Sequence, residues 1–300
     1  MKKLDTFISV VIPFFNREAY LLKAIQSVLD QSYPYWELIL VNDGSTDQSL
    51  EIAQSVSDPR VRVISYLQNQ GNAYARNRGW ESAKYDWVAY LDSDDWYQED
   101  YLKILCRAIS ENQLVSFFWT GVRFVTEDGK IGKEEWWKPL NSLPSDTFFD
   151  RLGIGTNAGV CFSRDILLKE KGFNEGFRAA VDREFFLRIS TRYQGKGIDY
   201  IGINCLLGSH ESVRKNYKNQ ADAYTKLIAM HKKLISLNPK RKAWWYHKAM
   251  WLNLYAENKR EAFSYFLKVK TNIKSVIVFV LFLVLSKKTA VYLHQKMAKS

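Results

Sequence analysis

Short apolar runs alternate with polar turns and with helical periodicity between residues 7 and 92. The apolar runs are rich in β-branched residues and predict strands at residues 8–12, 37–41, 61–66 and 87–91. Between them, apolar side chains recur on one helical face at residues 17–31, 46–56 and 72–84, with Asn16 as the expected N-cap of the first helix. This alternation is typical of βαβ units, so we predict an α/β domain with a mostly parallel sheet flanked by helices.

The pattern becomes less regular after residue 97. We expect a helix at 98–111, a strand region at 113–125 that Gly121 interrupts, a short strand at 159–163 and a helix at 182–193. The composition changes soon afterwards, so we place the end of the α/β domain near residue 215.

Residues 216–300 are expected to form a basic helical extension. Apolar residues recur there with helical spacing at 220–236, 243–257 and 260–270. Residues 211–300 hold 19 of the 43 basic side chains of the protein but only 4 of its 32 acidic ones. This excess indicates an anionic partner. Because no nucleic-acid reader motif is present, we expect contact with anionic membrane and not with nucleic acid.

The run at 276–285 is wholly apolar, yet it is well short of the roughly 20 residues that a spanning helix needs. Lysines flank it on both sides, at positions 268, 270, 274, 287 and 288. Two interpretations are open. An interfacial helix at about 274–290 would let the lysine stems reach lipid head groups, and would place the protein at the inner face of the cell membrane. Alternatively, the run is a core helix of the extension.

The cysteines and the N-terminus bear on the compartment. Cys106, Cys161 and Cys205 are odd in number and show no C-x-x-C spacing, which is typical of reduced thiols. The basic N-terminus is followed at once by a strand-like run with no small-residue cleavage site. We therefore expect a cytoplasmic protein.

Polar clusters follow three of the predicted strands, at 13–16, 42–45 and 92–95. In open α/β sheets, ligands bind beyond the carboxyl ends of the strands, so these three clusters are expected to converge. Asp92, Asp94 and Asp95 repel one another unless a cation or hydrogen-bond donors offset their charge. Oxygen ligands on one short loop suit Mg²⁺ or Mn²⁺. The alternative is an acidic turn in which Asp95 caps the helix at 98–111.

Four motifs resemble those of inverting glycosyltransferase family 2, in the order of that family. They are Ile8-Ser9-Val10-Val11-Ile12-Pro13-Phe14-Phe15-Asn16, Val41-Asn42-Asp43-Gly44-Ser45-Thr46-Asp47, Ala75-Arg76-Asn77-Arg78-Gly79 and Leu91-Asp92-Ser93-Asp94-Asp95. The resemblance covers about residues 7–212. It implies a GT-A fold over residues 1–215, with a nucleotide-binding half at about 1–97 and an acceptor-binding half at about 98–215.

The resemblance also implies roles for single residues. Pro13, Phe14 and Asn16 would lie along the nucleotide, and Asp43 would accept a hydrogen bond from the base. Ser93 would approach the nucleotide. Arg76 would approach it too or, as is commoner for an arginine on a helix, would pair with a nearby acid. Asp92 would contact the ribose or the metal, and Asp94 would ligate the metal directly. His210 follows a loop where many relatives carry a histidine that completes the metal shell or touches the diphosphate. The alternative is that His210 is only a loop residue, since the usual Tyr-Arg before that histidine is absent here.

Inversion requires a base that deprotonates the acceptor hydroxyl as it attacks. In the family this base is the Asp of a Glu-Asp pair, and the matching stretch here begins Val181-Asp182. Asp182 takes the position of the base, and Val181 replaces the usual Glu. Two alternatives stay open: Glu184 is the base, or Asp182 only caps its helix.

The predicted function is metal-dependent, inverting transfer of a sugar from a nucleoside-diphosphate sugar, with uridine the expected base, to a hydroxyl of a saccharide or lipid-linked acceptor. This would serve the synthesis of cell-surface glycans. One rival is a catalytically idle nucleotide-sugar binding module, which the replacement at Val181 suggests. Another is a nucleotidyltransferase, but such enzymes carry a glycine-rich phosphate loop after the first strand, and Pro13-Phe14-Phe15-Asn16 is not such a loop.

Overall fold

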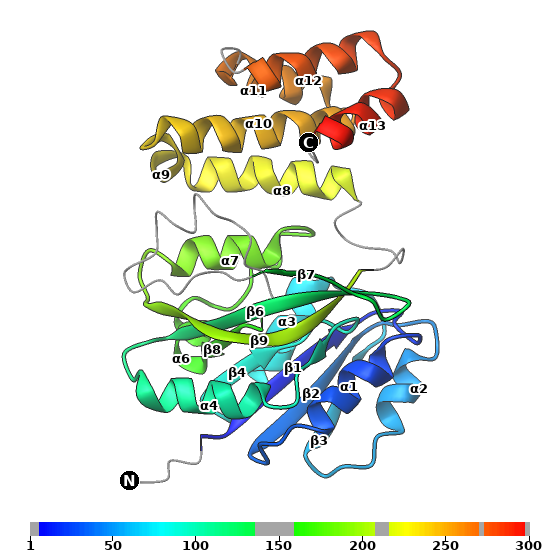
Figure 1. The fold of residues 1–300 in the computed structure, drawn as a ribbon, viewed down its shortest axis with the longest axis vertical. Coiled ribbons are helices and arrows are strands. Elements are labelled where there is room, and N and C mark those ends of the chain that lie inside the picture. The colour runs from blue at the N-terminus through cyan, green and yellow to red at the C-terminus, as the bar shows by residue number, and fades with distance from the viewer. Residues whose placement is uncertain (1–5, 136–158, 208–215, 270–272, 298–300) are drawn as a thin grey trace. The chain divides into compact units, whose positions relative to one another are not determined.

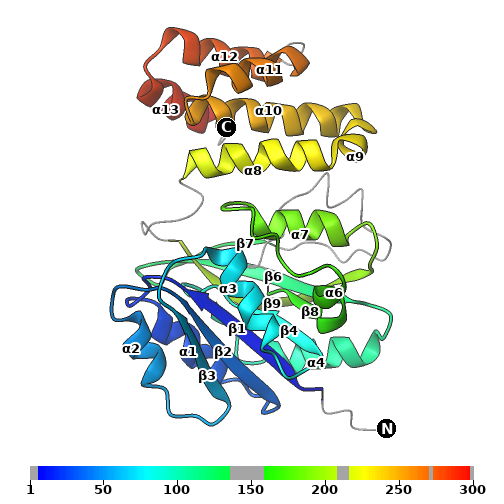
Figure 2. The same cartoon turned by 180° about the vertical axis from the view of Figure 1, so that it is seen from behind.

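The computed structural model describes residues 6–135, 159–207, 216–269 and 273–297 (Figures 1 and 2). The chain divides into two compact units. The first comprises residues 1–176 and 181–209, and the second comprises residues 177–180 and 210–300.

Four parallel strands form one half of the sheet in the first unit, in the order β3-β2-β1-β4. They are β1 (Ile8–Phe14), β2 (Trp36–Asp43), β3 (Val61–Tyr66) and β4 (Trp87–Tyr90). The helices between them are α1 (Leu21–Leu29), α2 (Ser49–Gln54) and α3 (Asn72–Glu81). All residues of β1 and β2 are buried, because helices cover both faces. This burial explains why these strands are mostly apolar and do not alternate between apolar and polar residues.

The two faces of the sheet are covered by different helices. Ile8, Val10 and Ile12 share a buried apolar cluster with residues of α1, α2 and α4 (Tyr101–Glu111). Figure 2 shows α3 on the opposite face, over β1. There α3 approaches closely, because Gly79 faces Val11 and a Cβ atom at residue 79 would overlap the Val11 side chain.

The other half of the sheet is mainly antiparallel. From β4 the order continues β8-β6-β9-β5, and β7 pairs with the outer part of β6. The elements of this half are β5 (Trp96–Tyr97), β6 (Phe117–Thr126), β7 (Ile131–Glu135), β8 (Cys161–Ser163), α6 (Arg164–Lys169), α7 (Val181–Ile189) and β9 (Gly195–Leu207). Only β6 and β9 pair in parallel in this half. The predicted α/β class is confirmed, as a mixed sheet flanked by helices.

Two predicted helix caps are wrong. The first helix begins at Leu21 and not at Arg17, and Asn16 has a left-handed backbone with φ of 50°. Its side chain accepts a hydrogen bond from Thr46 N in the next loop. Asp95 does not cap α4, whose N-cap is Asp100. Instead, Asp95 accepts a hydrogen bond from Leu206 N of β9, a partner far along the chain.

The second unit is helical, as predicted for the extension. Its helices are α8 (Tyr217–Met230), α9 (Lys232–Ser236), α10 (Pro239–Tyr255), α11 (Lys259–Val269), α12 (Ile273–Val284) and α13 (Lys287–Met297). The expected single helix at 220–236 is divided at His231. Within the described ranges, every helix falls short of the length and apolarity that crossing a membrane requires.

Candidate active site

Three loops meet at the carboxyl ends of the parallel strands, and hydrogen bonds join the first two. Asn16 N donates to Ser45 Oγ over 3.1 Å, and Thr46 N donates to Asn16 Oδ1 over 2.9 Å. Arg17 N donates to Ser49 Oγ over 2.7 Å. These bonds fix the loop after β1 against the loop after β2. They assign Asn16 a role in shaping the site.

Asp43 holds the loop between β3 and α3 in place. Its two carboxylate oxygens accept hydrogen bonds from Gln70 N and Gly71 N, each over 2.8 Å. These donors lie directly before α3. The backbone before α3 therefore fixes the position of the Asp43 carboxylate.

The acidic loop after β4 is neutralised in part by two arginines. Arg76, which is buried on α3, places Nη2 2.8 Å from Asp92 Oδ1. Arg17 Nε lies 3.9 Å from Asp94 Oδ2. Arg76 thus takes part in the site through an ion pair that orients the Asp92 side chain. The sequence gives no signal for the place of Arg17, since a lone arginine after a strand carries no motif.

Asp182 comes close to this loop from the far part of the chain. It lies in the first turn of α7, where Arg183 N donates to its Oδ1 over 2.9 Å. Burial raises the pKa of the Asp92 carboxyl, Arg76 lowers it, and the negative charges of Asp94 and Asp182 raise it again. The carboxylate of Asp182 therefore lies within electrostatic range of the Asp92 carboxylate.

Glu184 is far less suited to the role of base than Asp182. Its side chain is fully buried and makes two hydrogen bonds to Arg188, with Nε over 3.0 Å and Nη2 over 2.9 Å. Arg188 Nη2 also donates to Gly172 O over 2.8 Å. A carboxylate that is buried and paired in this way anchors α7 to the preceding loop.

Other predicted site residues are more deeply placed. Pro13 and Ser93 are buried, and Phe14 is only 2% exposed because its ring belongs to the core cluster. The ring of Phe14 is therefore turned away from any ligand, so only its backbone could lie along a nucleotide. Burial raises the pKa of Asp95 well above its ordinary value, and the charges of Asp94 and Asp92 add to this shift. His210 lies outside the described residues.

The chemistry of the acidic loop fits a hard divalent cation. Asp92 and Asp94 supply carboxylate oxygens at a half-buried position, where a third acidic group, Asp182, adds negative charge. The described part of the chain contains no group of three or more His, Cys, Asp or Glu side chains set to hold a metal ion. A cation held by Asp92 and Asp94 would thus take its remaining ligands from water and a bound phosphate.

Comparisons with known proteins agree with this geometry. Residues 9–170 match glycosyl transferase family 2. An uncharacterized glycosyltransferase of Haemophilus influenzae is 44% identical over 110 residues, which cover 36% of this chain and 44% of the relative. The putative teichuronic acid biosynthesis glycosyltransferase TuaG of Bacillus subtilis is 39% identical over 131 residues, covering 43% of this chain and 52% of TuaG. The chain thus spans about half the length of these two relatives.

A solved structure supports the fold. S. aureus TarS 1–349, in complex with UDP-GlcNAc, aligns with a TM-score of 0.62 over 89% of this chain and 91% of that one. Its sequence identity is 16%, so this likeness concerns the fold alone. The family match extends over more than half of the chain and includes the loops after β1, β2 and β4. The chain belongs to glycosyl transferase family 2.

Proposed function

We propose that the protein transfers a sugar from a nucleoside-diphosphate sugar to a hydroxyl group, with inversion and with help from a divalent metal. The acceptor would be a saccharide or a lipid-linked saccharide in cell-surface glycan synthesis. The observation that carries this proposal is the approach of Asp182 to the Asp92–Asp94 loop. A base and a diphosphate-binding loop are the two parts that inverting transfer requires.

The choice of donor has support from related proteins. TarS crystals contained UDP and UDP-GlcNAc, and TuaG is named for teichuronic acid biosynthesis. A uridine donor and a glycan acceptor are therefore the first to be tested.

The arginines would set the geometry of the donor site. Arg76 orients Asp92 from the buried side, so that its other oxygen can face a ligand. Asp94 and Asp92 would hold Mn²⁺ or Mg²⁺, which when bound neutralises the charge that develops on the leaving diphosphate. Arg17, near Asp94, is placed to offset further negative charge at the same loop.

Asp182 would act as the general base. Its carboxylate would take the proton of the acceptor hydroxyl as the oxygen attacks the anomeric carbon from the face opposite the diphosphate. The bond from the anomeric carbon to the diphosphate breaks as the new glycosidic bond forms, which inverts the configuration. Val181 is buried and supplies no second carboxylate, so Asp182 would act without the usual acidic neighbour.

A thermal-stability screen of nucleotide-sugars with Mn²⁺ tests the donor site. A ligand that binds only the folded state raises the melting temperature by mass action. We expect a metal-dependent rise with one uridine donor, and its loss in Asp94→Ala. Asp100→Ala, which removes an exposed acid outside the site, serves as the matched control. The binding proposal fails if no nucleotide-sugar shifts the melting temperature in the presence of metal.

We further propose that the extension attaches to anionic membrane. One face of α12 packs inside the extension, where Phe279 stacks on Phe266 with ring centroids 4.1 Å apart. The opposite face exposes an apolar stripe at a spacing of three and four residues, made of Ile273, Ile277, Val280 and Val284. The core interpretation fits the packed face of this helix, and the interfacial interpretation is what we propose for its exposed face. Nearby lysines would complement anionic head groups.

A further inference from the structure

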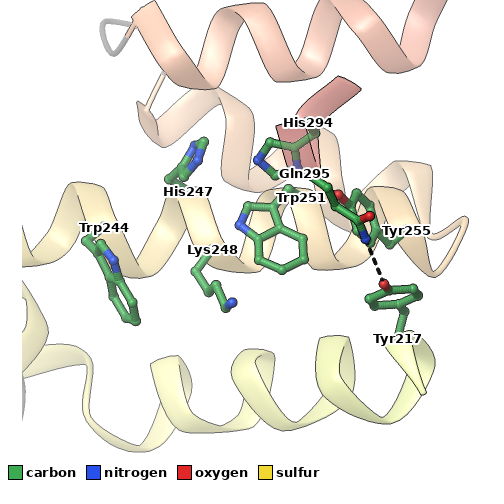
Figure 3. Close-up of a pocket in the computed structure, with 8 residues that line it drawn as sticks. All are labelled: Tyr217, Trp244, His247, Lys248, Trp251, Tyr255, His294 and Gln295. Carbon is green, nitrogen blue, oxygen red and sulfur yellow. Dashed lines mark hydrogen bonds between the residues drawn. The ribbon is translucent and has the colours of Figure 1, made fainter. Parts of the chain in front are cut away.

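The helical extension contains a cavity of about 300 Å³ that the proposed transfer reaction does not use. One stripe of α10 supplies most of its lining. Trp244, His247, Trp251 and Tyr255 follow one another at spacings of three and four residues, and Lys248 lies four residues after Trp244 and three before Trp251. Residues so spaced share one helix face. Figure 3 shows this stripe with Tyr217 of α8 and with His294 and Gln295 of α13. We call this site the α10 cavity.

Aromatic rings give the α10 cavity flat apolar surfaces. The Trp251 and Tyr255 rings lie 4.9 Å apart, and the Tyr217 and Tyr255 rings meet edge to face at 4.7 Å. Trp244 is 44% exposed, so its ring is open to a ligand. Aromatic side chains that combine an apolar face with a polar edge are well suited to a ligand that is itself apolar on one face and polar at its rim.

Two histidines line the same cavity. Nδ1 of His247 is bonded to Ser275 Oγ over 2.8 Å, and Nδ1 of His294 is bonded to Tyr255 Oη over 2.9 Å. Nε2 is therefore the atom of each ring that can bond to a ligand. The two rings are 6.2 Å apart and perpendicular, and Figure 3 shows both on the same side of Trp251.

The histidines are uncharged near neutral pH. Burial, with the nearby charges of His294, Lys248 and Lys274, lowers the pKa of His247 to about 4. Burial and Lys248 also lower the pKa of His294. A neutral imidazole Nε2 either donates or accepts, according to its tautomer. It is therefore suited to a hydroxyl group, which can do both.

The charges around the α10 cavity argue against cations and against multiply charged phosphates as ligands. Its lining residues include no carboxylate, and Lys248 lies 4.1 Å from the Trp251 ring centroid, so a metal ion or an amine would be repelled. The neutral histidines supply hydrogen bonds but no positive charge, which leaves one lysine in the lining to balance a multiply charged phosphate. A neutral ligand that is rich in hydroxyl groups fits best.

We propose that the α10 cavity binds a sugar ring of the glycan acceptor, stacked on tryptophan and hydrogen-bonded through His247 and His294. The volume is at the lower end of the roughly 300–1,000 Å³ of small-ligand pockets, as expected for one or two sugar rings. The identity of the sugar as part of the acceptor rests on the proposed function. The presence of a saccharide site in the extension does not.

The test is binding of the full-length protein, without donor or metal, to a panel of oligosaccharides of hexoses, N-acetylhexosamines and uronic acids. Tryptophan fluorescence and saturation-transfer NMR would follow binding, with inorganic phosphate titrated separately. We expect at least one oligosaccharide to bind, and Trp244→Ala and His247→Gln to weaken it at least tenfold. Trp244 is exposed, so its replacement leaves folding intact. Phe263→Ala, an exposed aromatic of α11 outside the cavity, and Asp94→Ala, at the donor site, should bind as the unaltered protein does.

Three results would overturn the proposal: no oligosaccharide binds, Trp244→Ala binds as well as the unaltered protein, or phosphate competes with the sugar at equal affinity. The last would make the cavity an anion site. A protein that binds the sugar through Trp244 but releases no nucleoside diphosphate would refute the transfer reaction and leave the saccharide site in place. The two failures are therefore distinguishable.

Discussion

Arg76 Nη2 lies 2.8 Å from Asp92 Oδ1, and this pair joins a buried helix to the acidic loop at the end of β4. The arginine is almost fully buried, whereas the aspartate is partly open to ligand. This ion pair fixes the Asp92 side chain, and the nearby carboxylates of Asp94 and Asp182 add negative charge around it. The site is thus held rigid before any donor arrives.

Replacement of Arg76 tests this arrangement. In Arg76→Met, Asp92 would lose its fixed orientation and its main positive neighbour. We expect kcat/KM for the donor to fall about 100-fold, which corresponds to roughly 2.7 kcal/mol. Arg78→Met is the matched control, because Arg78 lies on the same helix and pairs with Glu81 at the surface. Equal kinetics in the two variants would contradict a positioning role for Arg76.

Glu184→Gln separates the two candidate bases. Glu184 is buried against Arg188, so its neutralisation removes one of the two carboxylates that Arg188 contacts, and the free energy of unfolding should fall by about 1–3 kcal/mol. Activity per folded molecule should persist at low temperature. Denaturant unfolding and transfer kinetics on the same preparation check both expectations. A variant that is fully stable but inactive would instead favour Glu184 as the base.

Gly79→Ala probes the contact of α3 with β1. A Cβ atom at residue 79 would overlap Val11, so the helix must shift or the strand must yield. We expect the free energy of unfolding to drop by about 1–3 kcal/mol, although alanine is the better helix former. The double change Val11→Ala with Gly79→Ala makes room and should recover part of the loss beyond additivity. Strict additivity of the two changes would show that the overlap is not the cause.

His247 makes the stability of the extension depend on pH. Its pKa is near 6.5 when unfolded and about 4 when folded, so the unfolded state binds more protons between these values. Stability is therefore full above pH 6.5 and is lost as the pH falls toward 4, by on the order of 2 kcal/mol for a ring that is partly solvated. Urea unfolding at neutral and mildly acidic pH should show a smaller loss in His247→Gln. An identical loss in both proteins would refute the assignment.

Membrane attachment can be tested on the exposed stripe of α12. Ile277→Asp places a charge on the apolar face, and we expect it to reduce binding to vesicles of anionic phospholipid at least tenfold. Leu237→Asp changes an exposed apolar residue of the extension away from α12 and should have little effect. Flotation with anionic and with neutral vesicles would measure both. Equal flotation of the two variants would contradict the proposed surface.

The sequence predicted the parallel strands well, because β1 and β2 are buried on both faces and are therefore mostly apolar. It did not predict β9, because exposed and buried residues do not alternate regularly along this strand and three glycines lie within it. Nor did it predict that Asn16 adopts a left-handed backbone, that Asp95 bonds to Leu206, or that Arg17 lies near Asp94. Each depends on a partner in another element, which local periodicity does not encode.

In the candidate site too, some features could be predicted from the sequence and others depend on contacts between elements. The motifs of the sequence predicted that the loops after β1, β2 and β4 lie together. The register of the paired strands sets the distances between these loops. The choice between Asp182 and Glu184 needed tertiary contacts, since both residues lie in the first turn of α7. Glu184 is fully buried and paired with Arg188, whereas Asp182 adds negative charge at Asp92.

Sugar transfer by Asp182→Asn tests the central claim most directly. The amide keeps the size of the side chain and can still bond to Arg183 N, but it cannot take a proton. With donor, acceptor and Mn²⁺ supplied, we expect kcat to fall by about 10²–10⁴-fold while the affinity for the nucleoside diphosphate stays unchanged. Transfer by Asp182→Asn at the rate of the unaltered protein would contradict the assignment of Asp182 as the base.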